Sequence, residues 1–213
     1  MGDTHAFARL SDIPVGDRFE LPLHREDGSM AVEQAILRRR SVRAFSREQP
    51  DLYAVSQLLW SAAGITSEDG RRAAPSAGAC YPLELYLVCE YGLFHYLPGD
   101  PHTAVKLQTE DLRKGLAAAC LGQGFVAEAP ITLVFAAVYE RTTGRYGERG
   151  LRYVHVDVGH AAQNVHLQAV ALGLASVPVG AFDDDQVAAA LHLPKDHRPL
   201  YLVPVGHPAS RSA

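Results

Sequence analysis

Four arginines and a serine fall within residues 38–43 of this 213-residue chain, in the order RRRSVR. The guanidinium of arginine is a planar fork of N–H donors that matches pairs of phosphate oxygens, and a serine hydroxyl adds one more donor. The cluster therefore indicates a site for one compact dianion, such as the phosphate of a nucleotide or a flavin. In the alternative interpretation the arginines complement the negative end of a helix dipole, because they follow a segment with helical character.

The composition limits the classes of partner. Hydrophobic residues make up 47% of the chain and charged residues 21%, as in an ordinary globular domain of this length. The formal net charge is -4, so the arginine cluster is a local feature, and we expect neither nucleic acid nor a membrane as a partner. The chain has three cysteines, without C-x-x-C spacing, which is typical of a reduced compartment. No apolar segment is as long as that of a signal peptide or a membrane span. Together these features predict a cytoplasmic location.

Hydrophobic periodicity predicts helices and strands in an irregular order. Asp51 is a candidate N-cap and Gly64 a candidate stop for one helix, and an aspartate among residues 183–185 can cap another. Helices are expected over residues 30–40, 52–63, 111–123, 152–172 and from the capping aspartate to residue 191, and strands over 83–90, 93–98, 131–140 and 200–206. Segments 65–82 and 141–150 are expected to be loops, the second a possible lid because it is polar and holds three glycines. The irregular order favours an α+β domain.

A metal site is a second chemistry that the sequence suggests. His155, Asp157, His160 and His166 all lie on one predicted helix. Spacings of two, five and six residues do not bring ligands to the same helix face, and no H-E-x-x-H motif is present. We therefore expect structural or interface roles for these four residues, and no metal.

Six segments share the order and the motifs of one known family. They are RRRSVRAF (38–45), QLLWSAAGIT (57–66), RRAAPSAGACYPLELYLV (71–88), RYGERGLRYVHVDVGHAAQNVHLQAVALGL (145–174), SVPVGAFDDD (176–185) and LYLVPVGHP (200–208). In these segments the chain resembles the FMN-dependent nitroreductase superfamily, and within it the SagB-type dehydrogenase branch, which includes the azoline oxidases of peptide natural-product pathways.

The resemblance implies a mixed, mainly antiparallel sheet flanked by helices, and an intertwined homodimer with FMN bound at the interface by residues of both subunits. The helix at 152–172 would lie at the centre of that dimer. The chain would then divide into an N-terminal arm or extended lead-in (1–29), a nitroreductase-like FMN-binding domain (30–208) and a C-terminal tail (209–213). Arg211, in the tail, is a candidate for binding the phosphate.

The resemblance also assigns the cofactor residues. A backbone N–H of the segment at 178–181 is expected to bond to flavin N5, the atom that accepts hydride. The candidate FMN-binding residues are Arg39, Arg40, Ser41 and Arg43 at the phosphate and the pyrimidine side; Pro75, Ser76, Ala77 and Gly78 near the ring; Asn164 on the long helix; and Pro178, Val179, Gly180 and Ala181 against the flavin face.

Two further residues are candidates for catalysis. Azoline oxidases carry a Lys-Tyr pair after the long strand, where it serves in proton abstraction, and the corresponding residues here are Arg145 and Tyr146. The pKa of arginine is too high for it to act as a base near neutral pH, but it can polarise a carbonyl or bind an anion.

The resemblance predicts an FMN-dependent oxidoreductase that transfers hydride between flavin N5 and a small acceptor or donor stacked on the ring, with NAD(P)H as the expected reductant. One alternative is a SagB-type dehydrogenase or oxidase that acts on a modified peptide or another natural-product intermediate. A second alternative is a flavin-binding module with little turnover.

Overall fold

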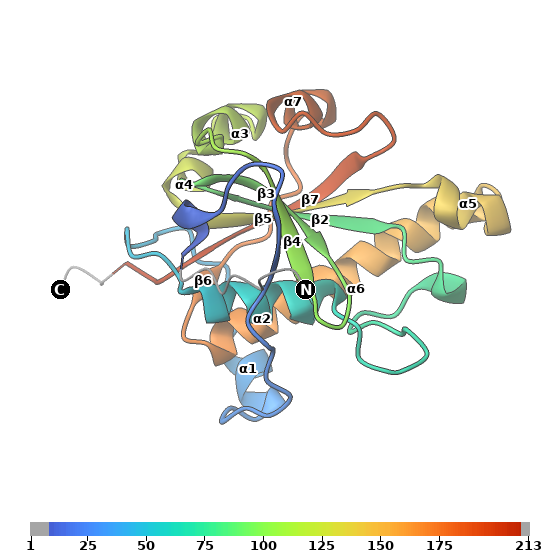
Figure 1. Ribbon diagram of the computed structural model, residues 1–213, viewed down its shortest axis with the longest axis horizontal. Coiled ribbons are helices and arrows are strands. Elements are labelled where there is room, and N and C mark those ends of the chain that lie inside the picture. The colour runs from blue at the N-terminus through green and yellow to red at the C-terminus, as the bar shows by residue number, and fades with distance from the viewer. Residues whose placement is uncertain (1–8, 210–213) are drawn as a thin grey trace.

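The computed structural model describes residues 9–209, and their seven β-strands form one sheet between two layers of helices (Figure 1). The strand order is β1-β4-β3-β2-β5-β7-β6, and each pair of neighbouring strands is antiparallel. The strands are β1 (Arg18–Glu20), β2 (Leu83–Cys89), β3 (Gly92–Leu97), β4 (Thr103–Gln108), β5 (Ile131–Ala137), β6 (Ala175–Ser176) and β7 (Arg198–Gly206). This arrangement confirms the expected α+β fold with an antiparallel sheet flanked by helices.

Helices cover both faces of the sheet. In Figure 1, α1, α2 and α6 lie on the lower side, and α3, α4 and α7 lie on the upper side. Their bounds are α1 (Val32–Arg38), α2 (Leu52–Ala63), α3 (Arg113–Ala119), α4 (Gly124–Glu128), α5 (Glu140–Tyr146), α6 (Arg149–Ala171) and α7 (Asp184–Ala190), with 3-10 turns η1 (Leu10–Asp12) and η2 (Ala77–Ala79). Among the described residues, no helix combines the length and the apolar character that crossing a bilayer requires.

Two hydrophobic cores flank the sheet, because successive side chains of a strand point to opposite faces. In β2, Leu85 and Leu87 belong to the core shared with α2 and α6, whereas Tyr86 and Val88 belong to the core shared with α3, α4 and α7. All residues of β5 are buried, since helices cover this strand on both sides. The centre of the sheet is thus a rigid support for the segments that leave its ends.

The long helix α6 carries the face that packs on the sheet and on α2. Its 23 residues span roughly 35 Å. The buried positions recur three or four residues apart and are Val154, Asp157, Val158, Ala161, Ala162, Val165, His166 and Ala169, with Gly150 in the first turn. Ala161 and Ala162 are small, which lets another helix approach closely.

The start of α2 is fixed by a predicted side-chain cap. The Oδ1 atom of Asp51 accepts a hydrogen bond from the Ala54 N–H at 2.7 Å. Replacing Asp51 with alanine is expected to lower the free energy of unfolding by about 1 kcal/mol, because that N–H loses its acceptor. Urea unfolding measures the change. The Asp51→Asn variant keeps a side-chain oxygen, so its free energy of unfolding should be close to that of the unchanged protein. An equal loss of stability in both variants would show that the charge of Asp51 matters and not the cap.

The prediction of a loop over residues 141–150 is wrong. Most of it forms α5, and α6 begins at Arg149, three residues earlier than predicted. Gly147 ends α5 with a positive φ of 58°, and Gly150 lies against the Thr143 backbone, where a Cβ would come within 2.9 Å of the amide nitrogen. The glycines therefore mark a helix end and a close helix contact, not a flexible lid.

Other elements differ from the sequence expectation at their bounds. The helix expected over 111–123 ends at Ala119, because Leu121 and Gly122 adopt positive φ angles, and α4 follows as a separate turn that was not predicted. The edge strand β1 and its neighbour β4 were also not predicted. They pair with each other through Phe19 and Ala104, both buried.

Candidate functional site

The arginine segment, residues 39–43, leaves the end of α1 and is held against the edge of the sheet. The Arg39 N–H bonds to the Ala35 carbonyl and completes α1. Two residues later, Ser41 forms an isolated parallel bridge with Ser176, and the Val42 N–H donates to the Ser176 carbonyl at 3.0 Å. The segment is thus fixed to β6, so its side chains project from a defined backbone.

The guanidiniums of this segment divide into two kinds. The Nη1 atom of Arg40 donates to the carbonyls of Leu37 and Arg39, at 2.8 and 2.7 Å, which is the helix-end role considered as the alternative. Arg39 and Arg43 form no ion pair with any residue in the described range 9–209, and Arg43 lies 5.7 Å from the centre of the Phe125 ring. Arg39 and Arg43 therefore keep donors for an anion.

A buried histidine lies under the arginine segment. His166, 4% exposed, makes a 2.8 Å hydrogen bond through Nδ1 to the hydroxyl of Ser176, and its Nε2 has no partner among the described residues. Burial, and then the positive charge of Arg39, lower the pKa of His166 to about 4. The sequence predicts a structural or interface role for His166, and its position among the valines and alanines of α6 was the signal for its burial.

The segment at 178–181 runs beside the middle of β7, where Val179 forms an isolated antiparallel bridge with Leu202. The Val179 N–H donates to the Leu202 carbonyl at 2.8 Å, and the Leu202 N–H returns a bond to the Val179 carbonyl. The carbonyl of Ala181 accepts from the Gln123 side chain. Gly180 is exposed, and within residues 9–209 its N–H has no acceptor. Of the four predicted residues, Gly180 and Ala181 both offer a backbone N–H that has no acceptor among the described residues.

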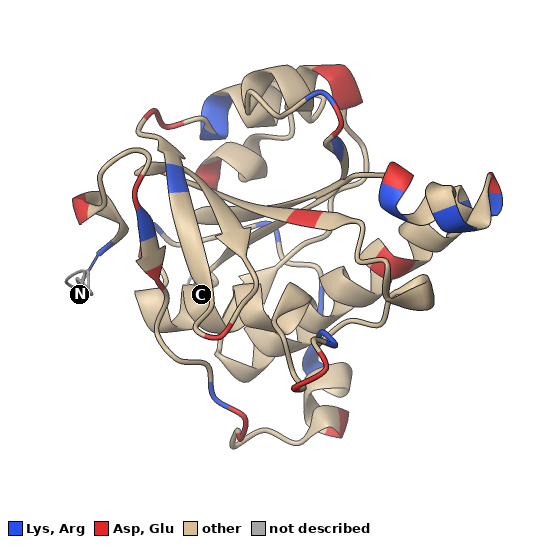
Figure 2. Ribbon diagram, turned by 45° about the vertical axis from the view of Figure 1, so that its right-hand side comes forward, with Lys and Arg blue, Asp and Glu red and all other residues tan. Residues whose placement is uncertain are grey.

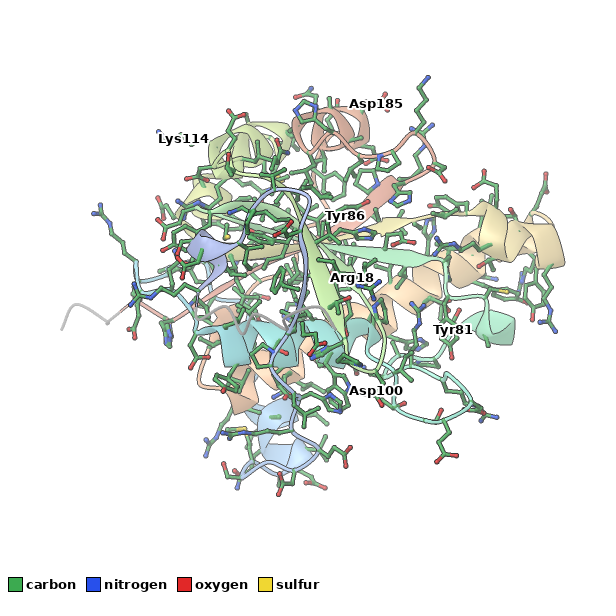
Figure 3. All side chains as sticks on the ribbon, in the orientation of Figure 1. Arg18, Tyr81, Tyr86, Asp100, Lys114 and Asp185 are labelled. Atoms are coloured by element: carbon green, nitrogen blue, oxygen red, sulfur yellow. The ribbon has the colours of Figure 1, made fainter. Side chains whose placement is uncertain are left out.

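The loop at 75–78 lies beside the N-terminal half of α6, near Tyr81 in Figure 3. The Ser76 hydroxyl donates to Asp157 Oδ2 at 2.6 Å and accepts from the Tyr81 N–H at 3.0 Å. Asp157 is buried, and this burial raises its pKa, although the bond from Ser76 opposes the change. Ser76 therefore uses its hydroxyl to fix the loop on α6. Pro75 is exposed and Ala77 is half-buried.

Gly78 brings this loop against the two candidate catalytic residues. Its φ of 61° lies in the left-handed region that favours glycine, and a Cβ there would overlap the Tyr146 hydroxyl. The Gly78 carbonyl accepts a 3.0 Å hydrogen bond from Nη1 of Arg145. The fold thus brings the end of α5 to a loop that is 67 residues away in the sequence.

Asn164 ties α6 to the rest of the same layer. Its Nδ2 donates to the carbonyls of Ser61 and Ala73, at 3.1 and 3.2 Å. These bonds position the start of the segment that leads to the 75–78 loop. Its assignment as a cofactor contact stays a prediction, as do those of the other site residues; Arg211 lies outside the described residues.

The two groups of predicted residues lie against different parts of α6. Ser176 contacts α6 at His166 and Ser76 contacts it at Asp157, so the two contacts lie about 14 Å apart along the helix. A cavity of about 20 Å³, room for one water molecule, lies behind the loop between Ser76, Asp157 and Arg72. A larger hollow of about 630 Å³ lies between α2, the end of α6 and the chain before α1, and it includes none of the predicted residues.

Residues 36–207 match the sequence pattern described as "Nitroreductase family". The chain belongs to the nitroreductase family. Within the described residues, no group of three or more His, Cys, Asp and Glu side chains could hold a metal ion.

Relatives and solved structures agree with this assignment. A Methanocaldococcus jannaschii protein named "Putative nitroreductase MJ1384" is 44% identical over 198 residues, 90% of this chain and 98% of that protein. A crystal structure from Ralstonia eutropha JMP134 with the same description has a TM-score of 0.83 at 28% identity, covering 93% of each chain. The Bacillus subtilis protein named "FMN reductase [NAD(P)H]" is 31% identical over 129 residues, 54% of this chain and 52% of that protein. The nitroreductase family resemblance is thus confirmed, and the SagB-type branch stays a prediction.

Proposed function

We propose that this nitroreductase-family chain is an FMN-dependent oxidoreductase, with hydride transfer between flavin N5 and a small acceptor or donor and with NAD(P)H as the reductant. The relative named as an FMN reductase supports both the cofactor and the reductant. Bound FMN would supply the redox chemistry, whereas the protein would bind it, orient it and set its electrostatic surroundings.

The observation that carries the proposal is the set of free donors around the arginine segment. Arg39 and Arg43 have no carboxylate partner in the described part of the chain, and there the Ser41 hydroxyl also lacks a hydrogen-bond partner. Two guanidiniums and one hydroxyl match the oxygens of a phosphate dianion. The free N–H of Gly180 suits an acceptor atom such as flavin N5, and the small side chain of Ala181 leaves room for a ring.

We further propose a homodimer in which two copies complete each site. The arginine segment and the 178–181 segment of one copy would bind FMN together with the 75–78 loop of the other, as the family resemblance implies for a cofactor shared by two subunits. Asn164 would support the site from α6. Exposed apolar side chains favour a covered surface: Val32, Ile36 and Leu37 on α1, and Leu151 and Val156 on α6.

Arg145 and Tyr146 would then contact the substrate at the edge of the flavin. The guanidinium of Arg145 carries N–H donors and no acceptor, so it can act only as a hydrogen-bond donor and a positive charge. The Tyr146 hydroxyl, beside Gly78, can donate a proton or a hydrogen bond to a reacting oxygen or nitrogen atom.

The three cysteines of the chain, Cys80, Cys89 and Cys120, are free thiols, which fits the proposed cytoplasmic location.

The first test is the absorption spectrum of the purified protein, repeated with NADH and NADPH without oxygen. Bands near about 370 and 450 nm that bleach would support a flavin enzyme reduced by a nicotinamide. Bands that persist with both reductants would favour the oxidase or the module with little turnover. A colourless protein that does not take up added FMN would contradict the proposal. Sedimentation analysis gives the number of subunits in the same sample.

A further inference from the structure

Two arginines of α5 differ in how their charge is neutralised. Arg141 donates to Glu84 at 2.5 Å, and although burial raises the pKa of Glu84, hydrogen bonds from His95 and Arg141 lower it to about 2. Arg145, one turn later, forms no ion pair within the described residues. Arg141 thus anchors α5 to the sheet, whereas the positive charge of Arg145 is left available.

The guanidinium of Arg145 is nonetheless held in place. One of its five N–H groups donates to the Gly78 carbonyl, and the others have no acceptor among residues 9–209. A side chain that is already fixed by one hydrogen bond loses less conformational freedom when it binds a ligand. A planar guanidinium also presents pairs of N–H groups to the two oxygens of a carboxylate or phosphate. Arg145 is therefore positioned to bind an anion.

An aromatic surface adjoins this charge. The Tyr146 ring meets the Tyr153 ring edge to face, with centres 5.2 Å apart, and its hydroxyl lies beside Gly78. Acidic residues lie at both ends of α5, Glu140 at its start and Glu148 just after it, and Figure 2 shows red and blue segments close together where this helix projects from the sheet. The guanidinium of Arg145 could bind an acidic group of a small ligand, while the neighbouring tyrosine ring contacts an aromatic ring of the same ligand.

We propose that Arg145 determines substrate specificity by binding a carboxylate or phosphate group on an aromatic or similarly planar substrate. This inference rests on the proposed function, because the loop at Gly78 is expected to lie near the flavin. It selects anion binding over carbonyl polarisation, since an unpaired guanidinium held at a fixed site gains most from a ligand of opposite charge.

The test uses the FMN-loaded protein and two probes that differ in charge, benzoate and benzyl alcohol. Binding is followed by the change in the flavin spectrum. The unchanged protein should bind benzoate about tenfold or more tightly than benzyl alcohol, and Arg145→Gln should remove most of that preference. Arg145→Lys, which keeps the charge but not the fork, should retain part of it. Kinetics with 4-nitrobenzoate and 4-nitrobenzyl alcohol should show the same pattern, mainly in KM.

Arg149→Gln is the matched control, because this substitution removes the same charge at another exposed position, where the guanidinium lies 5.7 Å from the centre of the Tyr153 ring and forms no ion pair within the described residues. It should leave the benzoate preference unchanged. Three results would overturn the inference. They are the absence of a preference for benzoate in the unchanged protein, a reduction of that preference by Arg149→Gln as large as that by Arg145→Gln, and an equal loss of affinity for both probes in Arg145→Gln. Failure to bind FMN at all would instead reject the proposed function, so the two failures are distinguishable.

Discussion

The Arg39→Gln variant is expected to bind FMN about a hundredfold more weakly than the unchanged protein, with little change in its affinity for riboflavin. Arg39 has no ion-pair partner in the described chain, so its donors can go to the phosphate. A hydrogen bond between charged groups contributes about 1.5–3 kcal/mol, and bidentate geometry places arginine at the upper end. Riboflavin lacks the phosphate and therefore isolates this contribution. Quenching of flavin fluorescence gives both dissociation constants.

Arg38→Gln is the appropriate control. Arg38 is the last residue of α1 and is exposed, and its substitution removes the same charge one residue away. If long-range attraction is small compared with direct contact, this variant should change the FMN affinity by about threefold or less at physiological salt. Equal losses of FMN affinity in Arg39→Gln and Arg38→Gln would mean that the segment attracts FMN through its overall positive charge and not through direct contacts. If Arg39→Gln lowered the affinity for FMN and for riboflavin equally, the substitution would instead have disturbed the fold.

Local chemistry explains which parts of the fold were predictable. Asp51 and Asp183 both cap helices through bonds to an N–H three residues later. The sequence therefore located the start of α2, and it restricted the start of α7 to the three aspartates at 183–185. The strands around residues 83–90 and 131–140 were predictable because continuous apolar runs need cover on both faces. The helix α5 was not predictable, because its segment is polar and rich in glycine, and the residue pattern does not reveal that Gly150 packs against the Thr143 backbone.

The candidate site shows the same division. The residue types at 38–43 and the motif order indicated a phosphate site and the segments that could contact a flavin. The sequence could not indicate that Arg145 bonds to Gly78, or that His166 bonds to Ser176, since each pair is joined only by folding. It also could not show that Arg40 turns back to its own helix while Arg39 does not. Partner choice among identical side chains is decided by backbone geometry.

The last prediction concerns His166 and acid stability. In the folded protein burial, together with the charge of Arg39, lowers its pKa to about 4, against 6.5 for the free side chain. Between these values the unfolded chain binds more protons than the folded one, so stability is complete above pH 6.5 and falls as the pH decreases toward 4. The free energy of unfolding should drop by about 2 kcal/mol between pH 7.5 and pH 5 through this residue.

The His166→Asn variant separates this effect from other groups. Burial also lowers the pKa of His102 and His197, so those residues add a pH dependence of the same sign. Asparagine can still bond to the Ser176 hydroxyl but does not titrate, so the variant should lose His166's share of the dependence and keep the rest. Urea unfolding of both proteins at pH 7.5 and pH 5 measures the difference. Parallel stability curves would mean that His166 is already hydrated or charged at neutral pH, and that the orphaned Nε2 has a partner in solution.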